Sequence, residues 1–288
     1  MYNGLTSLFI LDGYYHIFRA YFAPIGMQMT SLTGEPTTAT HMFIVSLLKL
    51  IREQKPDALV VAMEGKSKTF RQELYEDYKQ NRSEPPEDFI IQRDRIEQIL
   101  GAMHIPVLRA KRYEADDIIG TLTTKAYYTD YESIICSNDK DMYQLLNECT
   151  CMFNASTCKY MYTDGMVEKT GVQPHEFIDY LALQGDAGDN VPGLPNVGPK
   201  TAAKWIQKYG SVENLLEHLD EIKGRHNNTL KENKELLLLC KKLVTIDCDV
   251  PINIDFGSFD LQEYDRDKLL EIFTELGFNQ LILNMGLD

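Results

Sequence analysis

Short apolar runs alternate along the first half of the chain with segments of helical periodicity. The apolar runs have the length of buried strands and end at polar or acidic residues, at 8–11, 59–63 and 133–137. The helical segments repeat apolar side chains three or four positions apart, over 39–51, 92–100 and 116–126. This alternation predicts an α/β fold, a mostly parallel sheet with flanking helices and a ligand crevice at the carboxyl ends of its strands.

The pattern is interrupted twice. Segment 66–86 is polar, basic in places and closed by Ser83-Glu84-Pro85-Pro86, which predicts a protruding loop or a helical arch. From Leu181 the chain turns to glycine and proline and then to amphipathic helices as far as Leu243, which predicts a smaller helical domain. We therefore expect an α/β domain over 1–180 and a second domain with a C-terminal segment over 181–288.

The composition is that of an ordinary globular protein. The chain has 288 residues, of which 44% are hydrophobic and 25% charged, and this excludes a disordered or fibrous protein. No apolar run approaches the length of a membrane span or a signal peptide. Six scattered cysteines form no C-x-x-C pair, so neither a disulfide framework nor a zinc ribbon is expected. A reduced, cytoplasmic setting without a membrane partner is the prediction.

The net charge of −14 on its face argues against a polyanionic partner such as nucleic acid. Its distribution changes that picture. Nine acidic residues gather in five places. Four residues follow the three predicted strands, three open a helix and two follow Gly185: Asp12, Glu64, Asp139, Asp141, Glu114, Asp116, Asp117, Asp186 and Asp189. Singly, each could cap a turn or favour a helix start.

Together these carboxylates would repel one another unless cations offset the charge. Oxygen ligands without nearby cysteine or histidine indicate a hard cation, Mg²⁺ or Mn²⁺, rather than zinc. Two or more such ions imply phosphoryl transfer with water as the nucleophile.

Two segments are suited to a phosphate backbone. The stretch 191–202 is a glycine-bearing hairpin that runs into a helix, whose N-terminal amides make a phosphate seat. Lys200, Lys204 and Lys208 continue on one face of that helix, where a solvated basic stripe is the alternative. The candidate DNA-binding residues of this region are Gly193, Gly198, Lys200, Thr201, Lys204 and Lys208.

Segment 66–86 mixes basic and aromatic residues, which suits the binding of unpaired strands. Its members are Lys66, Lys68, Phe70, Arg71, Tyr75, Tyr78, Lys79 and Arg82. Phe70 and Tyr75 could equally belong to the core. Arg19 could reach the crevice or form a buried ion pair.

These motifs, in this order, resemble the bacterial and phage 5′ nucleases, the family of flap endonucleases and of the 5′→3′ exonuclease domain of DNA polymerase I. The resemblance covers nearly the whole chain. It rests on Leu11-Asp12-Gly13, Phe70-Arg71, Tyr78-Lys79-Gln80-Asn81-Arg82, Tyr113-Glu114-Ala115-Asp116-Asp117, Asp139-Lys140-Asp141, Gly185-Asp186 and Asp189-Asn190.

The resemblance implies a PIN-like α/β domain, a helical arch and a helix-three-turn-helix domain on duplex DNA, often with a monovalent cation such as K⁺ at the 193–198 hairpin. It implies metal-ligand roles for the nine carboxylates. By analogy, Lys79 and Arg71 would contact the scissile phosphate region, and Tyr78 would stack near the unpaired end.

The expected function is a structure-specific 5′ nuclease of DNA replication or repair, monomeric, that hydrolyses DNA at single-strand/double-strand junctions and leaves a 5′-phosphate. With no polymerase following, a stand-alone form is expected.

Glu64 stands where the family normally has Asp, and the extra methylene could alter the metal geometry. A branched-DNA-binding protein with weakened catalysis is therefore one alternative. A small-molecule phosphatase that uses Asp12 as covalent nucleophile is a more distant one, because the glycine hairpin and its lysines have no purpose there.

Overall fold

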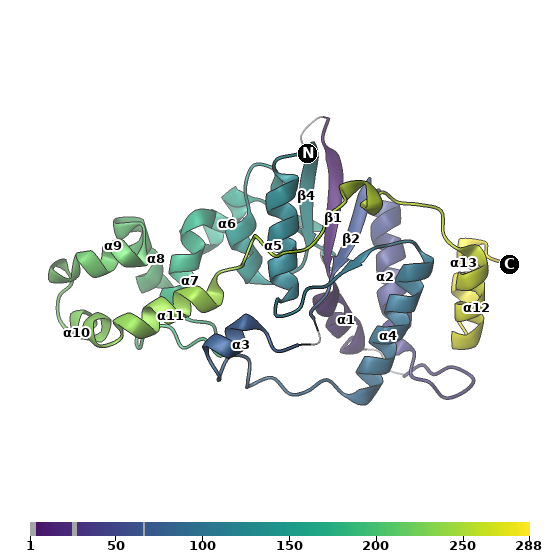
Figure 1. Cartoon of the computed structure of the whole chain (residues 1–288), viewed down its shortest axis with the longest axis horizontal. Coiled ribbons are helices and arrows are strands. Elements are labelled where there is room, and N and C mark those ends of the chain that lie inside the picture. The colour runs from purple at the N-terminus through teal and green to yellow at the C-terminus, as the bar shows by residue number, and fades with distance from the viewer. Residues whose placement is uncertain (1–3, 25–27, 66) are drawn as a thin grey trace.

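The computed structural model describes residues 4–24, 28–65 and 67–288. Its centre is a six-stranded sheet in the order β3-β2-β1-β4-β5-β6 (Figure 1). Five strands run parallel and the last is antiparallel to β5. The strands are β1 (Thr6–Asp12), β2 (Ala58–Ala62), β3 (Val107–Leu108), β4 (Tyr131–Cys136), β5 (Thr150–Asn154) and β6 (Lys159–Met161). The predicted mostly parallel sheet is confirmed.

Side chains alternate between the two faces of the sheet, as strand geometry requires. Phe9 and Leu11 of β1 point into one core, which the first helices close: α1 (Gly13–Tyr21), α2 (Thr38–Gln54) and α4 (Glu87–Ala102). Leu8 and Ile10 point into the other core, beneath α5 (Ala115–Ala126). The helices predicted from apolar spacing thus lie where the sheet needs cover.

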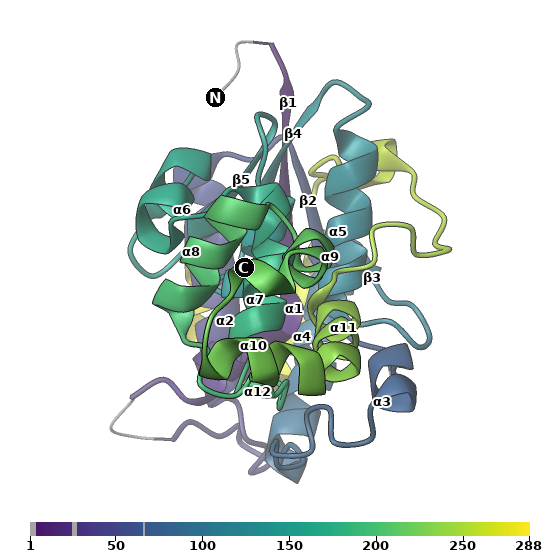
Figure 2. The same cartoon turned by 90° about the vertical axis from the view of Figure 1, so that its left-hand side faces the viewer.

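The second core continues from the sheet into a group of shorter helices, which project from one end of the sheet in Figure 1 and face the viewer in Figure 2. They are α6 (Thr163–Thr170), α7 (Phe177–Gln184), α8 (Pro199–Tyr209), α9 (Val212–Glu217), α10 (Arg225–Glu232) and α11 (Lys234–Val244). The predicted helical domain is present. Helix α7 runs across the predicted boundary at residue 180, so the two parts share a continuous helix and a continuous core.

The chain beyond α11 returns to the α/β part. Asp260 forms an isolated bridge with Ala58 of β2, and α12 (Arg266–Leu276) packs against α4. The last helix, α13 (Asn279–Met285), packs against α12, at the far end of the molecule from α9 and α10 (Figure 1). The C-terminal segment therefore belongs spatially to the α/β part, although in sequence it follows the helical domain.

Within the described part of the predicted arch, 67–86, the chain is helical only over α3 (Phe70–Leu74), and turns follow as far as residue 81. It does not project freely in this structure, because residues 77–82 bind the loop 186–190. The Lys79 amide donates to Asp189 O (3.0 Å), and Asn81 Nδ2 donates to Ala187 O (2.8 Å). Charge pairing with Asp189 adds to these backbone contacts. The predicted arch thus lies across the junction of the two parts of the molecule.

Candidate active site

Three acidic residues follow the carboxyl ends of neighbouring parallel strands. Asp12 ends β1 opposite Ala62 of β2, Glu64 follows β2 by two residues, and Asp139 follows β4 by three. Gly13 allows this approach, since a Cβ there would lie 2.3 Å from Met63 Sδ and 2.9 Å from Ala62 O. Helix α1 therefore starts directly against β2 and holds Asp12 at the sheet edge.

These carboxylates line one cleft of about 730 Å³. Asp116, near the start of α5, and Asp189, in the loop after α7, join them there, together with the basic side chains Lys79 and Arg82. The structure thus brings together five predicted ligands from five separate segments, at the strand ends where the parallel sheet predicts a ligand crevice.

Burial and mutual repulsion set the electrostatics of the cleft. Burial, with a contribution from Asp139 and Glu64, raises the pKa of Asp12 to about 6, even though Tyr15 N and Ser137 Oγ donate to it. Burial, with neighbouring carboxylates, also raises the pKa of Asp116 well above its ordinary value. Burial likewise raises the pKa of Glu64. Anionic carboxylates in this cleft are therefore held at a cost that a cation would offset.

Asp141 and Asp186 lie beside the cleft, near the 3₁₀ helix η1 (Lys140–Leu145). Asp141 is buried and its Oδ1 has no hydrogen-bond partner. Burial and then the charge of Asp139 raise its pKa well above the ordinary value. An orphaned buried oxygen among carboxylates fits a hard cation, which accepts oxygen ligands and neutralises charge.

Basic side chains hold several of the carboxylate oxygens. Lys79 Nζ lies 2.7 Å from Glu114 Oε1 and 3.5 Å from Asp189 Oδ2, and Lys140 Nζ lies 3.1 Å from Asp186 Oδ2. Among the described residues, no three Asp, Glu, His or Cys side chains already form a group that could hold one ion. The carboxylate oxygens and their negative charge fit Mg²⁺ or Mn²⁺. To bind such an ion, Glu114, Asp186 and Asp189 would have to give up their ion pairs with Lys79 and Lys140.

Lys79 also has a strained backbone, with φ of 58°. Its pKa is raised in spite of its burial, chiefly by Glu114 and Asp189. Conversely, Lys79 and Arg82 outweigh burial and lower the pKa of Asp189. Lys79 is therefore a fixed positive charge at the wall of the cleft.

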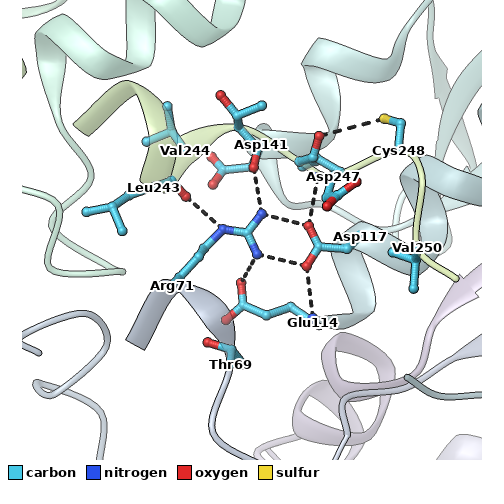
Figure 3. Close-up of polar contacts among 12 residues, drawn as sticks. Thr69, Arg71, Glu114, Asp117, Asp141, Leu243, Val244, Asp247, Cys248 and Val250 are labelled. Carbon is cyan, nitrogen blue, oxygen red and sulfur yellow. Dashed lines mark hydrogen bonds and ion pairs between the residues drawn. The ribbon is translucent and has the colours of Figure 1, made fainter. Parts of the chain in front are cut away.

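Arg71 and Asp117 form a separate, closed cluster (Figure 3). Arg71 is 2% exposed and Asp117 is fully buried. The guanidinium donates to both Asp117 oxygens (2.8 and 2.6 Å) and to Glu114 Oε2 (3.2 Å). Asp117 also accepts from the amides of Glu114 and Asp247. Neither residue lines the cleft. The roles that the resemblance implies, phosphate contact for Arg71 and metal binding for Asp117, therefore do not match their positions in this structure.

Tyr78 is likewise placed inside, with 3% of its surface exposed. Its hydroxyl donates to Glu114 (3.0 Å) and Asp189 (3.1 Å), so its ring is not presented for stacking here.

The remaining basic residues predicted to bind DNA lie outside the cleft or outside the described residues. Arg19 lines a separate small cavity with His16 and Ser46. Lys68 is exposed outside the cleft lining. Lys66 lies outside the described residues.

The hairpin before α8 is placed as predicted, at the surface of the helical domain. Gly198 caps the helix, Thr201 follows in its first turn, and Lys200 and Lys204 are exposed. Gly193 is required at its position, since φ is 63° and a Cβ would lie 2.4 Å from the Gly185 amide. Lys208 departs from the stripe, because its Nζ pairs with Glu221 Oε2 at 2.7 Å.

Sequence reasoning missed two features of the cleft. Ser137 links the Asp12 carboxylate to the backbone of Asp139, since its hydroxyl donates to Asp12 (2.9 Å) and accepts from the Asp139 amide (3.2 Å). Tyr14, Phe18 and Phe22 form an aromatic wall, with Phe18 and Phe22 stacked at 6.0 Å and Phe22 68% exposed. These three aromatic residues are spaced four apart along α1 and its C-cap, which places them on one face of the helix. That spacing could have predicted the wall from the sequence.

Two family models together match most of the chain. The 5′-3′ exonuclease N-terminal, resolvase-like domain matches residues 7–171, and the 5′-3′ exonuclease C-terminal SAM fold matches residues 172–267. DNA polymerase I of Caldicellulosiruptor bescii is 34% identical over 288 residues, covering 98% of this chain and 34% of that protein. DNA polymerase I of Bacillus subtilis is 35% identical, covering 98% and 32%. The chain thus spans about a third of the length of these relatives.

Solved structures share the fold. The T5 5′-exonuclease with bound zinc ions has a TM-score of 0.72 at 22% identity, covering 84% of this chain and 90% of its own. The bacteriophage T5 flap endonuclease in complex with DNA and metal ions has a TM-score of 0.71 at 20% identity, covering 96% and 98%. No described helix is long and apolar enough to span a membrane. From the two matched domains and these relatives, the chain belongs to the 5′-3′ exonuclease family.

Proposed function

We propose that this chain is a divalent-metal-dependent, structure-specific 5′ nuclease that hydrolyses DNA near single-strand/double-strand junctions and leaves a 5′-phosphate, in replication or repair. One observation carries the proposal: carboxylates from five segments converge with Lys79 and Arg82 in one cleft. A cytoplasmic monomer is the form we expect. Family membership supports the catalytic function over the weakened, DNA-binding alternative.

Asp12, Glu64, Asp116 and Asp139 are the proposed ligands of Mg²⁺ or Mn²⁺, with Glu114, Asp141, Asp186 and Asp189 on the adjoining side. Bound ions would supply Lewis-acid activation of water and neutralise charge on the phosphate. Ser137 holds the Asp12 carboxylate through its hydroxyl and fixes the backbone at Asp139 by accepting from its amide.

Lys79 supplies the fixed positive charge. Its Nζ pairs with Glu114 and Asp189, and Arg82 pairs with Asp189 beside it. If bound metal ions neutralised these carboxylates, both basic side chains could hold a phosphate oxygen instead. The wall of Tyr14, Phe18 and Phe22 offers π faces for the bases of an unpaired strand. Charge and stacking together favour a substrate with a single-stranded 5′ end.

The helical domain would hold the duplex. The N-terminus of α8 after Gly198 lies at the surface and carries the positive end of the helix dipole. Its first residue is Pro199 and the Thr201 and Ala202 amides donate to Gly198 O, so the dipole, with the exposed Lys200 and Lys204 along one face, would attract the phosphate backbone. Carbonyls of the 193–198 hairpin are the proposed site of a K⁺ ion shared with the DNA backbone. Omitting K⁺ in favour of a large organic cation should then weaken flap binding without abolishing cleavage.

The proposal is tested by incubating a labelled 5′-flap duplex with Mg²⁺, Mn²⁺ or EDTA. We expect metal-dependent incision at the junction and none by Asp139→Asn, which should still bind the flap. An RNA flap of the same sequence tests the substrate class. Wild type that binds flap DNA but cuts it with neither metal would contradict the proposal.

Glu64→Asp isolates the residue in which this chain departs from the family pattern. Cleavage by wild type with Mg²⁺ shows that Glu64 is compatible with catalysis. Cleavage only after the substitution would instead establish the binding alternative.

A further inference from the structure

Arg71 lies where three separate segments meet (Figure 3). It belongs to α3, yet its Nε donates to Leu243 O (2.9 Å) and its Nη2 to Thr245 O (2.6 Å), at the C-terminal end of α11. The remaining N–H groups bind Asp117 of α5 and Glu114. All five guanidinium donors are therefore used, and the free carbonyls at the end of α11 are satisfied by a charge from another segment.

A second connection lies beside it. Gln144 of η1 donates from Nε2 to Val244 O (3.0 Å), and its Oε1 accepts from the Ile246 amide (2.9 Å). Asp117 Oδ1 accepts from the Asp247 amide (2.9 Å). We call residues Arg71, Asp117, Gln144 and 243–247 the joint. It fixes the point at which the chain leaves the helical domain and returns to the sheet.

The joint connects the two halves of the proposed site. Helix α11 packs along α7, which in turn packs against α8, the helix that follows the 193–198 hairpin. Helix α5 carries Asp117, and Asp116 beside it lines the cleft. A change at the joint would therefore shift the duplex-holding surface relative to the carboxylates that line the cleft.

We propose that Arg71 is a positioning residue that determines which phosphodiester is cut, by fixing the helical domain to α5. This inference rests on the proposed nuclease function. Successive phosphates of one strand lie about 3.4 Å apart along the duplex axis, so a displacement of that size moves the incision by one nucleotide. At the centre of the joint, the planar guanidinium of Arg71 uses all five donors, which restricts such a displacement.

Arg71→Lys is the informative variant. Lysine keeps the buried positive charge but lacks the planar fork that joins Asp117 to two carbonyls at once. Gln144→Leu loosens the same joint without altering any charge. Arg95→Lys is the matched control, because Arg95 forks onto Glu35 (2.7 and 2.9 Å) and lies among α4 and the C-terminal helices, outside the joint.

The measurement is the distribution of incision products, at single-nucleotide resolution, on a static 5′-flap duplex with Mg²⁺. We expect the share of the main product to fall at least twofold in Arg71→Lys and Gln144→Leu, with new products one nucleotide away. Arg95→Lys should keep the wild-type distribution. Flap DNA affinity measured with Ca²⁺ should stay within about threefold in all three variants.

Stability is followed in parallel, because a purely structural role would lower the thermal midpoint without moving the cut. The proposal is overturned if both joint variants keep the wild-type distribution, or if Arg95→Lys broadens it equally. If wild type cuts no flap, the proposed function fails separately. In that case, amide hydrogen exchange over residues 245–250 tests whether Arg71 holds this segment in place. Faster exchange in Arg71→Lys supports the positioning role, and unchanged exchange refutes it.

Discussion

Asp116 and Asp117 are neighbours at the start of one helix, but they belong to different environments. Asp116 faces the cleft among other carboxylates, and burial raises its pKa well above the ordinary value. Asp117 is sealed against Arg71 and accepts four hydrogen bonds. One cluster holds excess negative charge that needs a cation from outside, whereas the other carries its own cation.

The difference shows how the fold separates reactivity from stability. Consecutive helical residues point about 100° apart, so a pair of acidic residues at a helix start can serve two surfaces. The open cluster stores repulsion that a bound metal ion would relieve. The closed cluster binds α3, α5 and the end of α11 together. Substitutions at the two positions should therefore have opposite effects.

The largest effect is expected at the closed cluster. Asp117→Ala leaves the Arg71 guanidinium buried without its main partner, and breaking such a pair costs about 3–5 kcal/mol. The free energy of unfolding, from urea titration at pH 7, should fall by that amount. A loss below about 1 kcal/mol would mean that the pair contributes little to the fold.

Asp116→Asn should do the reverse. Cleavage of a 5′-flap should fall by at least about 100-fold, the effect of removing one well-placed electrostatic group. Stability without metal should stay level or rise, since the substitution removes a buried, repelled charge. Single-turnover cleavage and urea unfolding of the same preparation give both values, and a strongly destabilised Asp116→Asn would contradict the comparison.

Asp12 should make the stability of the metal-free protein depend on pH. Its pKa is raised to about 6 in the fold, so the folded state binds the extra proton and stability from this group falls as pH rises through 6. Asp12→Asn should therefore stabilise the metal-free protein by about 1 kcal/mol more at pH 7 than at pH 5, as roughly one pKa unit of linkage requires.

Comparing each variant with wild type at the same pH removes other titrating groups, such as His16. Burial lowers the pKa of His16 to about 4, and this acts in the opposite direction. An Asp12→Asn effect that is equal at pH 5 and pH 7 would show that the carboxylate is not repelled.

The smallest effect is expected at Lys140, which pairs with Asp186 but is 40% exposed. Exposed pairs contribute about 0–1 kcal/mol, so Lys140→Met should raise Mn²⁺ affinity by no more than about fivefold. Calorimetric titration measures it. Weaker Mn²⁺ binding by Lys140→Met would indicate that this lysine supports the site instead of competing with the ion.

The strand-end carboxylates could be predicted from the sequence because parallel strands end at one edge of a sheet. Asp12, Glu64 and Asp139 needed only that rule and the apolar runs before them. The closed cluster could not be predicted, since Arg71 binds a carbonyl 172 residues away and nothing local marks it. The resemblance grouped Asp116 with Asp117 because sequence order does not show which way each side chain points.

The same limit applies to segment 66–86. Its polarity indicated exposure, but Tyr78 and Arg71 are buried there because Glu114, Asp117 and Asp189 supply partners from distant segments. The helical domain was predictable in outline from its glycines and amphipathic spacing. The return of α12 to α4 was not, because an amphipathic helix does not specify which core it covers.

The most direct test of the two-cluster account is Mn²⁺ binding to wild type, Asp116→Asn and Asp117→Asn, measured by calorimetry at a temperature where all three are folded. The account predicts that Asp116→Asn weakens binding at least tenfold, while Asp117→Asn stays within about threefold of wild type. Equal losses in the two variants, or a larger loss in Asp117→Asn, would contradict the separation of an open metal site from a closed structural cluster.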